Sequence, residues 1–350
     1  MSRQEVRSAE PARTNATPRR TLREVSFGTE ALKKLVEAEL RAVEAVIAQG
    51  LASDVPLVDE VGRHLATAKG KRLRPMLLLL VSKLGNAERK SAILSGGVVE
   101  LVHTATLVHD DQVDRSTVRR GRPTVNAEWD DQTAVIMGDY VFTKAFAMLA
   151  EQGLTEILDV LVRTTWRMCR GEMRQIADRR RADLTEEEYL LQINEKTASL
   201  IGAACEVGAR LAGLSPEARA ELAEFGEKAG LAFQLVDDVF DLVGNEAVLG
   251  KPVGSDFRAG RVTLPVIHSL RQAPPEERGF VIKSIAYPEL VDGSWPRVLD
   301  FVERHGGVEY ALGRADEYLR EAKAILAGFG EGPVVHALDG VIDYVLARER

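Results

Sequence analysis

The sequence predicts an all-α protein, on three observations. Apolar residues recur at spacings of three and four over long stretches, which is the period of an amphipathic helix. The regular alternation of apolar and polar residues that predicts a half-buried strand is missing at any convincing length. Residues that stop helices, glycine and proline, separate several of the periodic stretches. We therefore expect one bundle of helices.

The periodic stretches predict the main helices in chain order. They span 27–49, 88–109, 132–150, 154–178, 185–211 and 217–241. Helix stops are expected at Gly121-Arg122-Pro123, Gly153, Gly213 and Gly250-Lys251-Pro252. The segment 272–297 has a looser pattern and is expected to lie at the surface.

Size and charge narrow the classes of protein. A chain of 350 residues, 45% of them hydrophobic, can bury a substantial core. A net charge of −7 argues against general nucleic-acid binding. The longest purely apolar run, Met76–Val81, is far shorter than the ~20 residues of a membrane-spanning helix. We expect at most peripheral contact with a membrane.

The cysteines and the N-terminal segment predict a cytoplasmic protein. Cys169 and Cys205 lie in helical stretches without C-x-x-C spacing, so we expect two reduced thiols in the core. No signal-peptide pattern follows the N-terminus. Residues 1–24 are expected to be a disordered tail and 25–350 the folded domain. The alternative, an organelle transit peptide, is weakened by Glu5 and Glu10.

Two copies of one acidic pattern carry most of the functional information. Asp110-Asp111-Gln112-Val113-Asp114 and Asp237-Asp238-Val239-Phe240-Asp241 both read D-D-x-x-D inside apolar runs. On a helix the first and last aspartates share a face and repel by roughly 0.2–0.5 kcal/mol. Carboxylates suit Mg²⁺, which binds one or two of them together with substrate phosphates. The alternative, a solvated acidic face, would usually contain interleaved lysine or arginine, which both motifs lack.

Basic residues gather close to the acidic motifs. They are Lys69, Lys71, Arg72 and Arg74 on a predicted turn, Arg119, Arg120 and Arg122 after the first motif, Lys196, and Lys251, Arg258 and Arg261 after the second. Arginine offers a planar fork to phosphate oxygens and lysine a mobile point charge. The two sets predict a cavity between facing helices in which Mg²⁺ bridges a diphosphate, with a second anion site nearby.

These blocks resemble the trans-isoprenyl diphosphate synthases, or polyprenyl synthetases. The matching blocks are Gly70-Lys71-Arg72-Leu73-Arg74-Pro75, His103, Leu107–Asp114, Arg119–Thr124, Lys196-Thr197, Phe233–Asp241, Gly250-Lys251-Pro252 and Gly254-x-Asp256. The resemblance implies the all-α isoprenoid synthase fold with a central substrate cavity, a homodimer, and about three Mg²⁺ per active site. The implied reaction adds isopentenyl diphosphate to an allylic diphosphate such as farnesyl or geranylgeranyl diphosphate.

The resemblance also implies a role for each matching residue. Asp110 and Asp114 would hold two metal ions and Asp237 a third, with Asp111, Asp238 and Asp241 in support. Arg119, Lys196, Lys251 and Arg261 would bind the allylic diphosphate, although the family often has lysine where this chain has Arg261. Lys71, Arg74, His103 and Arg120 would bind isopentenyl diphosphate. Thr197 and Gln234 would direct oxygens at the developing carbocation.

Residues before the first motif predict the product length. The allylic tail would follow the helix that precedes Asp110, where one turn of about 5.4 Å roughly matches one isoprene unit. Ala105 stands where family members that make short products carry an aromatic residue. Small or aliphatic residues continue below it, namely Val102, Leu101, Val98, Gly97 and Gly96. They predict an open tunnel and a product of about C30–C50 for a quinone side chain. The alternative is that the small residues only permit close helix packing.

There are three alternatives to a long-chain synthase. A class I terpene cyclase usually carries N-x-x-x-S/T-x-x-x-E as its second metal motif and would not need Lys71 and Arg74. A non-catalytic synthase subunit tends to lose aspartates, and both motifs are intact here. A short-chain synthase of the geranylgeranyl type remains open, because it would differ only in product length.

Overall fold

The structure, a computed structural model, describes residues 22–67, 70–244, 253–287 and 291–346. Residues 1–21 of the expected tail, Lys69 and the Gly250-Lys251-Pro252 stop lie outside the described residues. The described chain is almost entirely helical, which confirms the predicted fold class.

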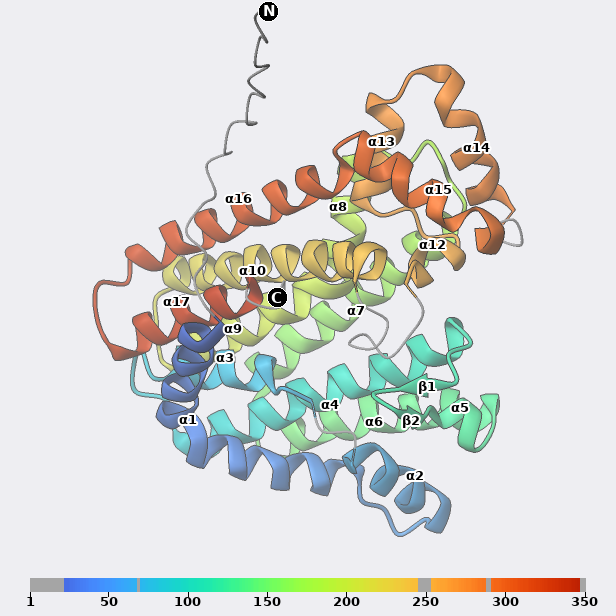
Figure 1. Cartoon of the computed structure of the whole chain (residues 1–350). Helices are drawn as coiled ribbons and strands as arrows, with labels where there is room; N and C mark the ends of the chain where they lie inside the picture. The colour runs from blue at the N-terminus through green and yellow to red at the C-terminus, as the bar shows by residue number, and fades with distance from the viewer. Residues whose placement is uncertain (1–21, 68–69, 245–252, 288–290, 347–350) are drawn as a thin grey trace, which may run out of the picture.

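Seven helices make up most of the bundle (Figure 1). They are α1 (Leu22–Leu51), α4 (Arg89–Val113), α6 (Asp131–Glu151), α7 (Thr155–Ala177), α9 (Ser199–Leu211), α10 (Pro216–Val243) and α16 (Gly307–Ala327). The other described helices are α2 (Pro56–Thr67), α3 (Leu73–Ser82), α5 (Val125–Glu128), α8 (Glu186–Ile193), α12 (Ser255–Arg258), α13 (Leu264–Gln272), α14 (Pro275–Ala286), α15 (Val291–Arg304) and α17 (Pro333–Leu346). The strands β1 (Val118–Arg119) and β2 (Arg122–Pro123) pair antiparallel, with Val118 opposite Pro123.

Helix packing in the bundle places α10 between α9 and α16, and α4 against α6 and α1 (Figure 1). The α3 helix is apolar all round, as expected of a helix surrounded by others, and Leu77–Leu80 are fully buried. Glycines allow the closest crossings. A Cβ atom on Gly226 of α10 would lie 2.8 Å from the Cα of Gly202 in α9. The two helices therefore approach each other nearly backbone to backbone.

Five of the predicted stretches form single helices, and one does not. The stretch 185–211 is divided into α8, a π-helical turn η1 (Asn194–Ala198) and α9. A π-helical turn inserts one residue into the helix and is frequent at functional sites. Apolar periodicity did not reveal it, because the π-helical turn shifts the register by one residue without ending the helical run.

Most described residues of the segment 272–297 lie at the surface, as expected, but the segment is helical and contains a few buried side chains. Most of this segment forms α14 and the start of α15, which group with α13 beyond the end of α10 (Figure 1). Trp295 is only 8% exposed, and its ring lies where a Cβ atom on Gly254 would be. Its ring centroid is 5.9 Å from that of Phe257. The C-terminal helices thus support the segment that follows the second acidic motif.

One of the two cysteines is outside the core. Cys205 is buried in α9 as predicted, but Cys169 is exposed on α7, and that prediction was wrong. The helical period places Cys169 on the outer face of a helix whose other face is apolar.

Two helices, α4 and α6, are long and apolar enough to cross a membrane by length and composition alone. The apolar stretch of α4 is 61% buried within the bundle, which identifies it as a core helix. That of α6 is 39% buried and leaves Val135 and Ile136 exposed.

Candidate active site

Both acidic motifs lie at the C-terminal ends of long helices. The first closes α4, where the backbone N–H of Asp114 donates to the carbonyl of Asp110 at 2.8 Å. The second lies in the last two turns of α10, which ends at Val243. The C-terminal end of a helix carries a partial negative charge, so carboxylates there are electrostatically unfavourable. The site therefore needs cations from elsewhere in the bundle.

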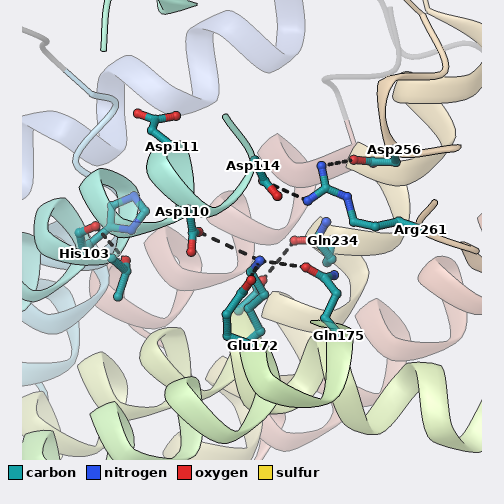
Figure 2. Close-up of polar contacts among 12 residues, drawn as sticks. His103, Asp110, Asp111, Asp114, Glu172, Gln175, Gln234, Asp256 and Arg261 are labelled. Atoms are coloured by element: carbon teal, nitrogen blue, oxygen red, sulfur yellow. Dashed lines mark hydrogen bonds and ion pairs between the residues drawn. The ribbon is translucent and has the colours of Figure 1, made fainter. Parts of the chain in front are cut away.

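Burial divides each motif in two. Asp111, Asp238 and Asp241 are at most 5% exposed, whereas Asp110, Asp114 and Asp237 are partly exposed. Figure 2 shows Asp111 pointing away from Asp110. The resemblance implies the same division. The buried aspartates are the expected supporting residues, and the partly exposed ones are the expected metal ligands.

The three buried aspartates have protein donors. Arg119 Nε donates to both oxygens of Asp111, at 2.8 and 2.9 Å. Tyr189 OH donates to Asp238 Oδ2 at 2.5 Å. Asp241 accepts from Ser255 Oγ at 2.5 Å and from the backbone N–H of Asp256 at 2.9 Å. Buried carboxylates require such donors. These contacts fix Arg119 and the segment after α10 in place.

Asp114 accepts hydrogen bonds from two guanidinium groups. Arg261 Nη1 lies 2.9 Å from Asp114 Oδ2, and Arg179 Nη2 lies 3.2 Å from Oδ1. Arg261 also pairs with Asp256 at 3.0 Å (Figure 2). The two acidic motifs are thus linked through arginine, because Asp256 follows the second motif and Asp114 ends the first.

Asp110 is compensated less completely. Its nearest cation, Lys196 Nζ, lies 4.0 Å from Oδ2 and is shared with Glu172 and with Gln175 Oε1, the latter at 2.8 Å (Figure 2). Burial raises the pKa of Asp110 to about 6; Lys196 opposes this shift, and Glu172 and Asp114 add to it. A carboxylate in this state is a ready ligand for a further cation.

The π-helical turn η1 carries Lys196 and Thr197. A Cβ atom on Gly171 of α7 would lie 2.5 Å from the backbone N of Lys196, so only glycine allows this close contact. Thr197 Oγ1 donates to Gln234 Oε1 at 3.0 Å, and Gln234 Nε2 donates to Asp238 Oδ1 at 2.7 Å. The Thr197 and Gln234 side chains are therefore held by the second acidic motif.

A second group of cations surrounds His103. His103 and Arg120 line one pocket together with Arg72 and Arg119. Burial lowers the pKa of His103, and neighbouring arginines lower it further. Burial also lowers the pKa of Arg74; Glu100 opposes this shift, and Arg120 adds to it. Arg74 Nε is buried without a hydrogen-bond partner among the described residues. Buried, incompletely paired cations of this kind predict an anion site, and Lys71 precedes α3 at the same place in the chain.

The residues predicted to set product length are all buried in α4. Ala105, Val102, Leu101 and Val98 are each 0% exposed. Leu101 Cδ1 lies 2.3 Å from the position of a Cβ atom on Gly50 in α1, and a Cβ atom on Gly97 would lie 2.3 Å from Val46 Cγ1. Leu101 and Gly97 therefore form the packing face against α1, as the alternative interpretation of the small residues expected.

The donor set fits Mg²⁺ shared with a phosphate ligand. Among the described residues, no three carboxylate, histidine or cysteine side chains are grouped to chelate a metal by themselves. Magnesium commonly takes only one or two carboxylates and completes its shell with water and substrate phosphates. Partly exposed Asp110, Asp114 and Asp237 offer the hard oxygens that this mode requires, and Asp110 has excess negative charge beside it.

Comparison with known proteins decides the family. The Polyprenyl synthetase family profile matches residues 55–291. The chain belongs to the polyprenyl synthetase family. It is 34% identical over 321 residues to octaprenyl diphosphate synthase of Escherichia coli strain K12, covering 92% of this chain and 99% of that protein. It is 38% identical over 290 residues to a short chain isoprenyl diphosphate synthase of Methanothermobacter thermautotrophicus, covering 82% and 89%.

A solved polyprenyl synthase has the same fold. The polyprenyl synthase from Caulobacter crescentus CB15, complexed with calcium and isoprenyl diphosphate, matches with a TM-score of 0.87 and 33% identity. The match covers 95% of this chain and 100% of that one. This agreement confirms the isoprenoid synthase fold that the sequence predicted.

Four residues of this polyprenyl synthetase site were missed in the sequence. They are Glu172, Gln175, Arg179 and Tyr189. Glu172 and Gln175 lie three residues apart, so they share a face of α7, and Arg179 opens a visible run of three arginines. These signals were available, but none of them lies next to either D-D-x-x-D motif in the sequence. His109, by contrast, is directed out of the site, because its Nε2 lies 3.0 Å from the Val135 carbonyl of α6.

We expect Asp110→Asn to stabilise the metal-free protein. A raised carboxyl pKa means that ionised Asp110 costs folding free energy at pH 7, and the cost fades as the pH falls through about 6 toward the ordinary value of 3.8. The free energy of unfolding, measured by urea titration in EDTA, should rise by about 1–3 kcal/mol at pH 7 and hardly change near pH 4. Asp159→Asn, at an exposed pair with Arg163, is the control. Destabilisation by Asp110→Asn at pH 7 would contradict the electrostatic account.

Proposed function

We propose that the protein is a trans-polyprenyl diphosphate synthase that condenses isopentenyl diphosphate with an allylic diphosphate. The observation that carries this proposal is the pairing of two D-D-x-x-D helix ends with two distinct groups of cations. One group, around Asp110 and Asp114, suits a diphosphate shared with metal. The other, around Arg74 and His103, suits a diphosphate bound without metal.

The allylic diphosphate would occupy the metal side of the cavity. Asp110, Asp114 and Asp237 would hold about three Mg²⁺, each completed by diphosphate oxygens and water. Arg119, Lys196 and Arg261 would bind the remaining oxygens, and Lys251, which lies outside the described residues, is expected to join them. The position of Arg119 is set by Asp111, and that of Lys196 by Glu172 and Gln175.

Isopentenyl diphosphate would bind in the second group of cations. Lys71, Arg74, His103 and Arg120 are its proposed ligands. The low pKa of His103 keeps the imidazole neutral, so it can donate one hydrogen bond without adding charge. Arg74 brings a buried Nε donor that has no partner among the described residues.

The reaction follows from this arrangement. Bound Mg²⁺ would neutralise charge that builds on the departing diphosphate. Arg119 and Lys196 are already held in place, so they stabilise the same charge without reorganising. The C1–O bond breaks, the double bond of isopentenyl diphosphate forms a bond to C1, and a proton leaves to pyrophosphate. The Thr197 hydroxyl and Gln234 carboxamide, anchored through Asp238 to Tyr189, would place oxygens near the allylic cation.

We propose farnesyl or geranylgeranyl diphosphate as the primer and a product of about C30–C50, which would serve as a quinone side chain. Ala105 and Val102, which precede Asp110 on α4, are the residues proposed to leave room for a long tail. A shorter product of the geranylgeranyl type is the second candidate, since this chain is also similar to a short chain isoprenyl diphosphate synthase. Val98 and Leu101 lie deeper, with Leu101 against α1.

We propose that two copies of the chain associate through α6 and α7. An apolar stripe is exposed on α7 at Val162, Trp166 and Met173, and Val135 and Ile136 are exposed on α6, which contacts α7. Such a stripe on a helix face indicates a protein interface. The same face makes α6 the less buried of the two longest apolar helices. We place this dimer in the cytoplasm, with at most peripheral contact with a membrane.

We expect Asp237→Ala to reduce turnover by at least about 100-fold, because it removes a metal ligand at the departing diphosphate. The measurement is the steady-state rate with isopentenyl diphosphate, farnesyl diphosphate and Mg²⁺. Asp316→Ala, at an exposed pair with Arg320, should retain the wild-type rate. Circular dichroism establishes that both variants are folded. Near wild-type turnover by folded Asp237→Ala would refute the metal assignment.

Product length should respond to Ala105. We expect Ala105→Phe to shorten the main product by one or more C5 units, because the aromatic ring would fill the space one turn below Asp110. Mass spectrometry of the products gives the length, and Ala105→Ser, which hardly changes the volume, is the control. Overpacking costs typically 1–3 kcal/mol, so the thermal transition of both variants should be recorded. An unchanged product distribution in folded Ala105→Phe would sink the tunnel proposal.

The dimer proposal predicts that charge on the stripe separates the copies. The double variant Val162→Glu with Trp166→Glu should sediment as a monomer, whereas the wild type should have twice the mass of one chain. Leu57→Glu with Ile282→Glu alters two exposed apolar residues elsewhere and should leave the dimer intact. A dimeric double variant at α7, or a monomeric wild type, would rule out this interface.

A further inference from the structure

The segment between α7 and α8 carries Arg179, Arg180 and Arg181, and it is firmly held. Arg181 pairs with Asp178 at 2.6 Å and with Glu188 at 3.1 Å. The N–H of Arg180 donates to the carbonyl of Gly260 at 2.8 Å, in the segment after the second acidic motif. The segment that contains Arg179 therefore has a defined position. Arg180 contacts the segment after α10, and Arg181 contacts α8.

Arg179 is the member of this run that enters the site. Its Nη2 donates to Asp114 Oδ1 at 3.2 Å, while its Nε is buried without a partner among the described residues. Arg261 occupies the other oxygen of the same carboxylate at 2.9 Å. Arg261 pairs with two carboxylates, those of Asp114 and Asp256. The ion pair of Arg179 is with Asp114. The described structure thus places two guanidinium groups on one proposed metal ligand.

Coordination of a cation by Asp114 would weaken both contacts. A metal ion competes for the lone pairs of the carboxylate and repels a guanidinium close to it. Arg261 would still pair with Asp256, whereas the carboxylate that Arg179 contacts is that of Asp114. The diphosphate that would complete the metal shell then offers Arg179 a new anionic partner. A planar guanidinium with free N–H groups matches diphosphate oxygens, and Arg179 is tethered closely enough to remain at the site.

We propose that Arg179 is a further binding residue for the metal-bound diphosphate of the allylic substrate and of the pyrophosphate product. This proposal rests on the proposed function, since it assumes that Asp114 binds metal in the presence of a diphosphate. Arg179 exchanges Asp114 for the diphosphate when the site is filled, and it returns to Asp114 when pyrophosphate leaves. The competing interpretation is a purely structural pair that holds the 178–184 segment against α4.

The test is calorimetric binding of inorganic pyrophosphate to the full-length protein at saturating Mg²⁺. Arg179→Gln should weaken binding by about 10- to 100-fold, the value of a hydrogen-bonded charge pair. Arg179→Lys keeps the charge and should recover part of the loss. Arg163→Gln is the control, because Arg163 lies on α7 and forms an exposed ion pair with Asp159. It should bind pyrophosphate like wild type. Binding of isopentenyl diphosphate without Mg²⁺ should be equal in all four proteins.

Three results would overturn the proposal. Wild-type affinity for pyrophosphate in Arg179→Gln would leave Arg179 as a structural pair, and the proposed function would stand. An equal loss of metal-free isopentenyl diphosphate binding would show a general effect of charge or folding. If the wild-type protein itself binds no pyrophosphate with Mg²⁺, the proposed function fails, and the inference about Arg179 fails with it.

Discussion

The site depends on the repulsion between carboxylates at the C-terminal ends of α4 and α10. Each end adds a partial negative charge to aspartates that already repel one another. The protein satisfies the buried members with fixed donors, such as Arg119 on Asp111 and Tyr189 on Asp238. Among the described residues, Asp110 has only a shared lysine, Lys196, at 4.0 Å. Burial raises the pKa of Asp110 to about 6 and that of Asp238 to about 8, so ionised carboxylates are unfavourable at both motifs. These carboxylates therefore lower the free energy of unfolding of the metal-free protein at the place where metal and diphosphate are proposed to bind.

The surrounding bundle brings the compensating cations together from distant parts of the chain. Lys196 reaches the site on a π-helical turn that Gly171 allows to approach α7 closely. Arg261 arrives on the segment after α10, which Trp295 supports from the C-terminal helices. Gly171 and the buried Trp295 therefore both help to position cations that compensate the aspartates. Substitutions at these positions would act on the site through the backbone.

Much of the fold and the outline of the site could be predicted from the sequence. Long helices follow from apolar periodicity, and each D-D-x-x-D motif is local, so spacing alone places Asp110 and Asp114 on one face. What sequence could not supply is the partner of each group. Tyr189 and Asp238 are 49 residues apart, and no local pattern links them. The π-helical turn escaped detection because it shifts the register by one residue without ending the helix. The buried Trp295 was missed because short helices rich in proline resemble loops.

Product analysis of the purified protein is the decisive experiment. The protein would be incubated with isopentenyl diphosphate, farnesyl diphosphate and Mg²⁺, and the products identified by mass spectrometry. We expect Mg²⁺-dependent elongation in C5 steps to a product of about C30–C50, which requires an open path along α4 for the growing tail. A product of C15–C20 would keep the chemistry but contradict the path for a long tail. Absence of any elongation with Mg²⁺ would contradict the assignment of the two acidic motifs to diphosphate chemistry.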